Sequence, residues 1–271
     1  MYELNDQEFA SFRGFIYEAA GITLSESKKA LVSGRLEKRL RHHRVKSFGE
    51  YFELLSQQRD PSEVQIAVDL LTTNETYFFR EIKHFELLRE HAAAARAEGR
   101  TLRVWSAACS SGEEVYSIAM VLADVLGLDS GRRPWEVLGT DISTRVLRRA
   151  GFGHYPVERT THIPPQYLQR YCLRGTGVQA GTLLVQRSLR ERVTFMHANL
   201  DRPLPPGLGS FDLIFLRNVM IYFNAETKRR VVTRLLPQLK QDGTLLIGHS
   251  ETLNDLGVGM RIVSPSVYTK V

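Results

Sequence analysis

Apolar side chains in the first 71 residues recur at helical spacing only. One stripe lies near the start of the chain, and two more follow in later segments. A helix start is also marked at residues 60–63, where Asp60 suits the N-cap, Pro61 the first helical position and Glu63 the third. The stripes consist of Phe9, Phe12, Ile16 and Ala19, of Val32, Leu36 and Leu40, and of Val64, Ala67, Val68 and Leu71. This pattern predicts an all-helical N-terminal domain spanning residues 1–72.

From about Thr101 the pattern changes, because short apolar runs of strand length alternate with segments of helical periodicity. The predicted strands cover residues 101–108, 137–141, 193–199, 211–218, 243–250 and 266–271. The predicted helices cover 113–126, 144–150 and a segment that Asn224 caps and that continues to about Leu239, where Asp242-Gly243 stops it. Buried strands separated by helices are typical of a parallel α/β sheet. Residues 73–271 are therefore predicted to form one α/β domain.

One stretch inside this domain does not follow the alternation of strands and helices. Residues 174–189, RGTGVQAGTLLVQRSL, are rich in turn-forming and β-branched residues. Such a composition is typical of a hairpin or a small antiparallel sheet. We therefore predict a small β-subdomain inserted at about residues 172–190.

The composition limits the location and the partners of the chain. It has 271 residues, of which 43% are hydrophobic, and no apolar run long enough to cross a bilayer. Its N-terminus, MYELNDQEFA, is polar and acidic, unlike a secretory signal. The two cysteines, Cys109 and Cys172, are too few for a disulfide framework, so a cytoplasmic location is expected. The net charge of +6 favours an acidic partner, which could be nucleic acid, a membrane surface or an acidic protein.

Candidate chemistry gathers where the predicted parallel strands end. A turn of small residues, 106–112, follows the first strand, and Asp141, Asn199 and Arg217-Asn218 follow later ones. Ligands of open α/β sheets bind outside the carboxyl ends of the strands, so these groups are expected to share one site. Asp141 suits an acid that accepts ribose hydroxyls, and it also suits a cap for the following helix. The other strand-end signals favour the ligand interpretation.

The turn after the first strand lacks the glycine fingerprint of a dinucleotide or phosphate site. A pyrophosphate also needs a helix N-terminus free of negative charge, whereas the predicted helix opens with Glu113 and Glu114. Two carboxylates suit a cation, and S-adenosylmethionine carries a sulfonium, an ammonium and no phosphate. The turn therefore fits S-adenosylmethionine better than NAD. Compensation of the helix dipole would also explain the two glutamates.

Six longer motifs follow one another along nearly the whole chain. They are TTNETYFFRE (72–81), WSAACSSGEEVYSIAM (105–120), GTDIS (139–143), ANL (198–200), RNVMIYF (217–223) and GHSE (248–251). With these motifs the chain resembles the chemotaxis receptor methyltransferases, the CheR-type enzymes that methylate glutamates of chemoreceptors. The resemblance implies an α/β class I (Rossmann-like) methyltransferase sheet with an N-terminal all-helical domain and a small inserted antiparallel β-subdomain. It also implies S-adenosyl-L-methionine as cofactor, S-adenosyl-L-homocysteine as product and glutamyl methyl esters as the modification for chemotactic adaptation.

The resemblance further implies which residues contact the cofactor. Glu114 would hold the ammonium, Asp141 the ribose, and Asn199 and Leu200 would flank the adenine. Arg80 and Tyr222 form the pair nearest the chemistry. The implied cofactor contacts are Asn74, Thr76, Arg80, Glu114, Asp141, Asn199, Leu200, Arg217 and Asn218. The substitution of Val115 for the proline of many relatives touches none of these positions.

Three rival functions are weaker on the sequence. An amino-methylating nucleic-acid methyltransferase would carry [DN]-P-P-[YFW] where this chain has RNVMIYF, so no nucleic-acid partner is expected. A non-catalytic S-adenosylmethionine-sensing regulator would lose Arg80 or Tyr222, and both are present. A nicotinamide dehydrogenase lacks support from the glycine pattern. The eight histidines show no metal-ligand spacing, so no metal is assigned.

The expected partner is the cytoplasmic helical region of methyl-accepting chemoreceptors, without direct membrane insertion. A basic stripe opposite the apolar face of the second helix would dock this acidic bundle. Its members are Arg35, Lys38, Arg39 and His42. Some members of the family capture a receptor C-terminal pentapeptide on the β-subdomain, and RGTGVQAG resembles their loop. No general base is expected, because a glutamate is already ionised at neutral pH.

Overall fold

The described N-terminal part of the chain is helical, as the apolar stripes predict, although the third of its four helices carries none of the three stripes. The computed structural model describes residues 2–57, 60–128 and 134–271. The helices are α1 (Asp6–Ala20), α2 (Lys29–His43), α3 (Phe48–Ser56) and α4 (Pro61–Leu71), with a 3₁₀ turn η1 (Glu26–Lys28) before α2. Asp60 caps α4 by accepting from the backbone of Ser62 and Glu63, with Pro61 at the first position, so the predicted helix start is confirmed.

A buried carboxylate ties these helices together. Glu63 of α4 is almost fully buried and pairs with Arg39 of α2. It also accepts a hydrogen bond of 2.6 Å from the Tyr51 hydroxyl and lies 3.1 Å from Nε2 of His43. Because a buried charge is tolerated only when it is paired and hydrogen-bonded, Arg39 is the internal counterion of Glu63. Arg39, a member of the predicted basic stripe on α2, is therefore engaged in an ion pair inside the protein.

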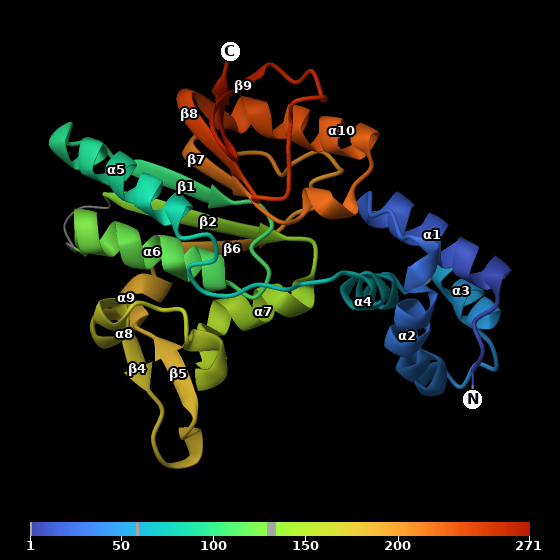
Figure 1. The fold of residues 1–271 in the computed structure, drawn as a ribbon. Helices are drawn as coiled ribbons and strands as arrows, with labels where there is room; N and C mark the ends of the chain where they lie inside the picture. Colours follow the sequence, from blue (N-terminus) through green and yellow to red (C-terminus); the bar gives the residue numbers. More distant parts are fainter. Residues whose placement is uncertain (1, 58–59, 129–133) are drawn as a thin grey trace.

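The sheet of the larger part has seven strands in the order β6-β2-β1-β7-β8-β10-β9. The strands are β1 (Leu102–Ser106), β2 (Trp135–Asp141), β6 (Val193–His197), β7 (Phe211–Leu216), β8 (Leu239–Ile247), β9 (Met260–Ser264) and β10 (Val267–Lys270). The first five in this order are mutually parallel, and β10 runs antiparallel to both β8 and β9. Figure 1 shows α1–α4 lying beyond the ends at which the parallel strands finish.

Helices cover both faces of this sheet, which explains its continuous apolar strands. Along β1 the side chain of Val104 enters one core and that of Trp105 the other, as the two-residue period of a strand requires. On the first face lie α5 (Lys83–Ala97) and α6 (Glu113–Leu126), which pack against each other (Figure 1). On the second face lies α10 (Ala225–Leu235), whose buried side chains join the core of the N-terminal helices.

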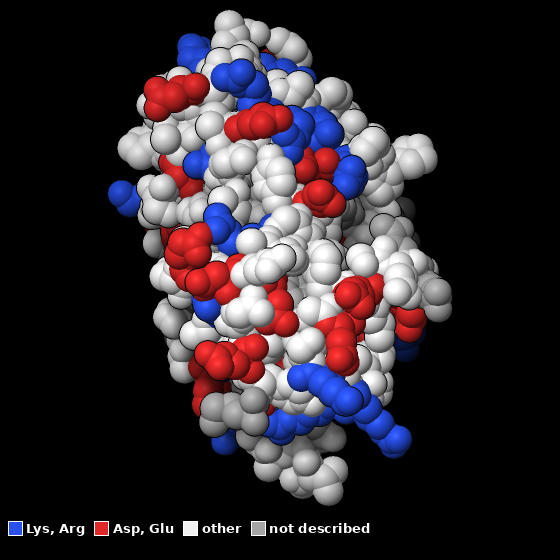
Figure 2. Space-filling model, turned by 90° about the vertical axis from the view of Figure 1, so that its right-hand side faces the viewer, with Lys and Arg blue, Asp and Glu red and all other residues white. Residues whose placement is uncertain are grey.

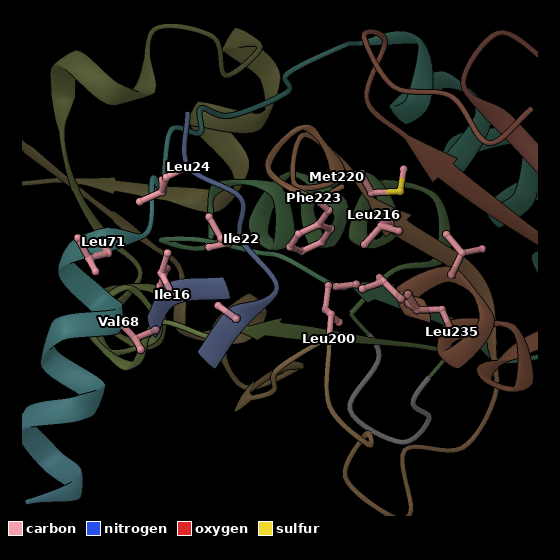
Figure 3. Packing of buried hydrophobic residues seen from close by; sticks show 14 of the residues in the cluster. Ile16, Ile22, Leu24, Val68, Leu71, Leu200, Leu216, Met220, Phe223 and Leu235 are labelled. Atoms are coloured by element: carbon pink, nitrogen blue, oxygen red, sulfur yellow. The ribbon is translucent and has the colours of Figure 1, made fainter. Parts of the chain in front are cut away.

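The N-terminal helices and the sheet share one continuous core. Figure 3 shows side chains of α1, α4 and the segment after α1 beside those of β7, of α10 and of the segments that follow β6 and β7. The labelled members are Ile16, Ile22, Leu24, Val68, Leu71, Leu200, Leu216, Met220, Phe223 and Leu235. Burial of such a cluster holds the two parts together along the edge of the sheet where ligands are expected.

The last predicted helix ends earlier than its periodicity indicates. It stops at Leu235, a 3₁₀ turn η5 covers Leu236–Gln238, and β8 begins at Leu239. Pro237 explains this end, because proline lacks the N–H and clashes with the preceding turn. The predicted stop signal, Asp242-Gly243, lies inside β8, where the register with β7 shifts. The strand β9 was not among the predicted strands; it is short, and its apolar Ile262 and Val263 are exposed rather than buried.

The inserted segment forms a separate three-stranded antiparallel sheet, seen below the main sheet in Figure 1. Its order is β3-β5-β4, with β3 (His154–Pro156), β4 (Cys172–Arg174) and β5 (Thr182–Val185). The predicted range of about 172–190 holds β4 and β5, whereas β3 comes directly after α7 (Thr144–Phe152). Two short helices, α8 (Pro165–Tyr171) and α9 (Arg187–Arg190), and the 3₁₀ turns η2 (Val157–Thr160) and η3 (Gly177–Gln179) complete it.

The sequence contains no apolar run long enough to cross a bilayer, and the helices of the structure can be compared with this expectation. Within residues 2–57, 60–128 and 134–271, none of the helices is both long and apolar enough to span a bilayer.

Gly112 lets two elements approach closely at the start of α6. Its φ is 95°, and a Cβ at this position would lie 2.8 Å from Cβ of Ala150 in α7 and 3.0 Å from the Tyr155 hydroxyl. We expect Gly112→Ala to lower the free energy of unfolding by about 2 kcal/mol or more, because overpacking and a left-handed backbone both oppose it. Urea unfolding of the purified variant measures this change.

Gly151→Ala in α7 is the matched control, because a Cβ there meets nothing within 4 Å. Since alanine is the better helix former, it should stabilise the protein by about 0.5–1 kcal/mol. Equal unfolding midpoints for the two variants would contradict the proposed close approach at Gly112.

Candidate active site

A cleft opens at the carboxyl ends of the parallel strands, between the sheet and the N-terminal helices. It encloses about 920 Å³, part of which is open to solvent. Every residue predicted to contact the cofactor lines this cleft, and so does Tyr222. These residues are Asn74, Thr76, Arg80, Glu114, Asp141, Asn199, Leu200, Arg217, Asn218 and Tyr222. The structure thus brings together all of the candidate site residues that the motifs supplied, whereas the basic stripe of α2 contributes none.

Asp141 ends β2 and fixes the turn that follows β1. Its Oδ2 accepts the backbone N–H of Ser110 at 2.8 Å, and its Oδ1 accepts that of Ser143 at 2.9 Å. The cap of α7 is the Ser143 side chain, so the alternative role of Asp141 as that cap is wrong. Burial raises the pKa of the Asp141 carboxyl, and the two backbone donors oppose the shift. A carboxylate has about four acceptor sites, so two remain for a ligand.

The two glutamates at the start of α6 face different ways. Glu114 lines the cleft, where its Oε1 accepts the Ser106 hydroxyl at 2.7 Å. Glu113 does not line the cleft; it is fully buried and pairs with Arg159 at 2.8 Å. The sequence predicts that both glutamates face a cationic ligand, but only Glu114 lies in the cleft where a ligand could bind. Burial raises the pKa of both carboxyls.

Arg217 lies beneath the cleft and binds two carboxylates at once. Its guanidinium is 2.8 Å from Oε2 of Glu114 and 3.0 Å from Oε2 of Glu81, and its side chain is only 1% exposed. It also donates to the backbone carbonyl of Arg80 and lies over the rings of Phe85 and Phe215. Two carboxylates on one guanidinium leave an excess of negative charge. This end of the cleft therefore suits a cationic group of a ligand.

Arg80 and Tyr222 both line the cleft and make few side-chain contacts of their own. Arg80 donates 3.3 Å to the carbonyl of Glu75, and its guanidinium lies over the Tyr77 ring. The Tyr222 side chain is half-buried, and burial raises the pKa of its hydroxyl. Among the described residues, none hydrogen-bonds to that hydroxyl. It is thus free to donate to a ligand.

The backbone around the cleft is strained at four positions. Phe79, Glu81, Ser110 and Asn218 have φ of 55°, 59°, 50° and 57°. Such left-handed conformations cost about 1–3 kcal/mol each for residues with a side chain and persist only where surrounding contacts enforce them. The enforcing contacts are visible here, for example the N–H of Phe79 on the Ser117 hydroxyl at 3.0 Å. Strain of this kind clusters at functional sites.

Two acidic residues at the site were not singled out by the sequence. Glu81 ends the first motif and pairs with Arg217. Glu251 ends the last motif and accepts the backbone N–H groups of Gly248, Asn218 and Ile221 at 2.6, 2.9 and 3.2 Å. It thereby fixes the loop that carries Tyr222. Both residues lie inside the quoted motifs, which was the only signal for them in the sequence. Their partners are far away along the chain, so the residues beside them do not indicate these contacts.

Asn199 links the cleft to the N-terminal helices. Its Nδ2 donates 2.7 Å to the carbonyl of Ala19 in α1, and its Oδ1 accepts the N–H of Asp201 at 3.0 Å. The segment after α1 reaches the other wall, where the N–H of Thr23 donates 2.8 Å to the carbonyl of Tyr222. Both walls therefore depend on the N-terminal part.

Glu81, His84 and His249 form the one group of potential metal ligands that occurs within the described residues. His84 is buried, and burial lowers its pKa to about 4, so its ring is neutral near pH 7. However, the oxygen of Glu81 that faces the histidines is the one held by Arg217. Since that guanidinium would repel a cation, the group is better explained as a support for the cleft.

The fold and the cleft together define a methyltransferase that uses S-adenosylmethionine. Residues 74–268 match the model of the CheR methyltransferase SAM-binding domain, and residues 7–72 match that of the CheR methyltransferase all-alpha domain. The chain belongs to this family of chemotaxis methyltransferases. The nucleic-acid methyltransferase, the cofactor-sensing regulator and the dehydrogenase are thereby disfavoured.

Named relatives cover almost the whole chain. It is 44% identical over 265 residues to the chemotaxis protein methyltransferase of Escherichia coli (strain K12), which covers 98% of this chain and 91% of that protein. Chemotaxis protein methyltransferase 2 of Pseudomonas aeruginosa is 43% identical over 263 residues, which cover 97% of this chain and 92% of that protein. The chemotaxis protein methyltransferase of Borreliella burgdorferi is 35% identical over 273 residues, 98% and 95%.

Proposed function

We propose that this methyltransferase esterifies glutamate side chains of chemoreceptors. The observation that carries the proposal is the mixed charge of the cleft lining: it has excess negative charge around Glu114, and it also presents the guanidinium of Arg80 and the free Tyr222 hydroxyl. The negative region suits the ammonium and sulfonium of the cofactor. Arg80 and Tyr222 suit an anionic acceptor, because both can donate hydrogen bonds to a carboxylate.

The proposed cofactor contacts distribute along this cleft. Glu114 holds the ammonium, Asp141 accepts the ribose hydroxyls with its two remaining acceptor sites, and Asn199 and Leu200 flank the adenine. The other proposed contacts surround the methionine part: Asn74, Thr76, Arg80, Arg217 and Asn218. Arg217 acts through Glu114, whose carboxylate it orients at 2.8 Å.

Asp141→Ala should weaken binding of S-adenosylhomocysteine about tenfold or more, because a buried charge-assisted hydrogen bond is worth about 1.5–3 kcal/mol. Asp141 also holds two backbone N–H groups, so Asp141→Asn, which keeps the shape, is measured beside it. Titration calorimetry gives both affinities, and thermal unfolding checks that the variants are folded. Unchanged affinity in both folded variants would remove Asp141 from the ribose site.

In this mechanism the residues of the chain transfer no proton and form no covalent bond; they orient the acceptor and the cofactor. When bound, the cofactor supplies an activated methyl group. The acceptor glutamate has a reference pKa of about 4.3 and is already a nucleophile at neutral pH. Within the described lining of the cleft there is no histidine that could serve as a base. Arg80 and Tyr222 align the carboxylate with the methyl group, and such alignment can supply about 7–11 kcal/mol of a barrier.

Two outcomes follow for the reaction. The product should be a glutamyl methyl ester that releases methanol in mild base. At saturating cofactor, the rate should show no ascending limb near the histidine pKa of about 6.5. Radiolabelled methyl transfer to receptor-containing membranes between pH 6 and 8 measures both. A rise in rate between pH 6 and 7.5 that disappears when one histidine is replaced would disprove a mechanism without a base.

We also propose that the exposed part of the α2 stripe contacts the receptor. Lys38 and His42 are exposed, whereas Arg39 pairs with Glu63 and Arg35 donates to the backbone carbonyls of Leu71 and Thr72. Figure 2 views the molecule from the side of the N-terminal helices and shows basic and acidic side chains interspersed there. Docking would therefore depend on a few positions rather than on one large basic patch.

Reversal of charge at the exposed positions tests this contact. Lys38→Glu with His42→Glu should slow methylation severalfold at low salt, because rim charges steer encounter, and should leave cofactor affinity unchanged. Lys83→Glu, an exposed lysine at the start of α5, is the control and should methylate at the normal rate. Equal initial rates for both variants would argue against docking by α2.

The β-subdomain is a second proposed contact with the receptor. Its strand β4 is an edge of the small sheet, and Leu173 on it is exposed, so a peptide can add as a further strand. A flexible receptor tail held there would raise the local concentration of substrate. Calorimetric titration with receptor C-terminal pentapeptides that end in an aromatic residue measures this binding. Absence of heat with all of them would indicate an untethered enzyme.

A further inference from the structure

A second groove adjoins the cleft and is lined by four arginines. We call it the arginine groove; it is open to solvent and shares residues 72–77 with the wall of the cleft. Its arginines come from three parts of the chain: Arg35 from α2, Arg145 and Arg149 from α7, and Arg159 from η2. The acidic residues among its described lining are Glu75 and Glu158. The lining therefore carries two more positive than negative charges.

Most of this positive charge is not neutralised within the protein. Arg35 donates to the backbone carbonyls of Leu71 and Thr72, and Arg145 to that of Asp69. Arg149 makes no hydrogen bond or ion pair with any residue in the described ranges. Only Arg159 has a carboxylate partner, Glu113. Arg35 also donates to the Thr73 hydroxyl, so part of its donors are occupied, but like Arg145 and Arg149 it keeps a positive charge that can attract an external anion.

The cations also act on one another. The pKa of Arg35 is lowered first by burial and then by the positive charge of Arg145, which belongs to the other part of the chain. An anion between them would relieve this repulsion. The planar guanidinium presents paired donors that match a carboxylate, so a protein carboxylate is the ligand chemistry that the groove fits.

The groove opens beside the reacting end of the cleft. The shared wall includes Glu75, whose carbonyl accepts a hydrogen bond from Arg80. Arg35 contacts the same wall, because it donates to the carbonyl of Thr72 and the hydroxyl of Thr73, which line both the groove and the cleft. A substrate with one carboxylate at Tyr222 would have its neighbouring groups over the arginine groove.

We propose that the arginine groove holds a second carboxylate of the acceptor, one or two helical turns from the glutamate being esterified. This inference rests on the proposed function. Residues three, four or seven apart share one face of a helix at about 5.4 Å per turn, so an acidic helical segment presents its carboxylates in a row. The affinity of the enzyme for an acceptor glutamate then depends on the charge of the side chains one or two helical turns away from it. A neighbour that is already esterified or amidated binds more weakly.

The test uses the full chain and a chemoreceptor cytoplasmic fragment in two forms. Both forms keep one acceptor glutamate; the other glutamates of the helical region are retained in the acidic form and replaced by glutamine in the neutral form. The wild-type protein should show a KM about tenfold lower for the acidic form, since several partly exposed charge pairs contribute. Arg149→Glu should lose this preference, and Arg35→Gln should reduce it.

Arg148→Glu is the matched control, because Arg148 is exposed on the same helix and lies outside the groove. It should retain the wild-type preference, and normal binding of S-adenosylhomocysteine verifies that each variant is folded. Equal KM values of the wild-type protein for both fragments, or equal effects of Arg148→Glu and Arg149→Glu, would overturn this inference alone. Absence of methyl transfer to either fragment would overturn the proposed function and this inference with it.

Discussion

The cleft depends on one buried cation shared between two carboxylates. Arg217 is almost inaccessible to solvent, and both Glu81 and Glu114 reach it from separate segments. Breaking a buried pair leaves an uncompensated charge, so each of the three groups constrains the other two. Glu81 in turn accepts the N–H of His249 and contacts Asn218, which extends the constraint to the last motif. One ion cluster thereby positions four segments that are distant in sequence, those of Glu81, Glu114, Arg217 and His249.

A second constraint is that the cleft has walls from both parts of the chain. Asn199 is tied to α1, Tyr222 is tied to the segment after α1, and Ile22 pairs with Phe223 as an isolated β-bridge. The shared apolar core behind these contacts includes Ile16 and Leu200 (Figure 3). The N-terminal part thus helps to build the cleft, and its helix α2 is the proposed surface for the partner.

Much of this arrangement could be predicted from local patterns. The helix Glu113–Leu126 was predicted at its observed bounds, and the buried strands and the polar groups at their ends led to the cleft. The features that could not be predicted depend on contacts between residues that are distant in sequence. The inward role of Arg39 depends on a buried glutamate of another helix. The left-handed backbone of Glu81 and the triple acceptor role of Glu251 leave no mark on the residues beside them.

The bridge between Ile22 and Phe223 has a consequence for how the protein is assembled. During synthesis the segment that holds Ile22 emerges early, whereas the segment of Phe223 follows β7 and appears much later. The cleft, which both segments line, therefore forms only after most of the chain has been made. Because a ligand that binds only the folded state stabilises everything that forms its site, the cofactor links both parts into one cooperative unit. A chain that lacked the segment of Ile22 or that of Phe223 would lose this bridge and, with it, the mutual stabilisation.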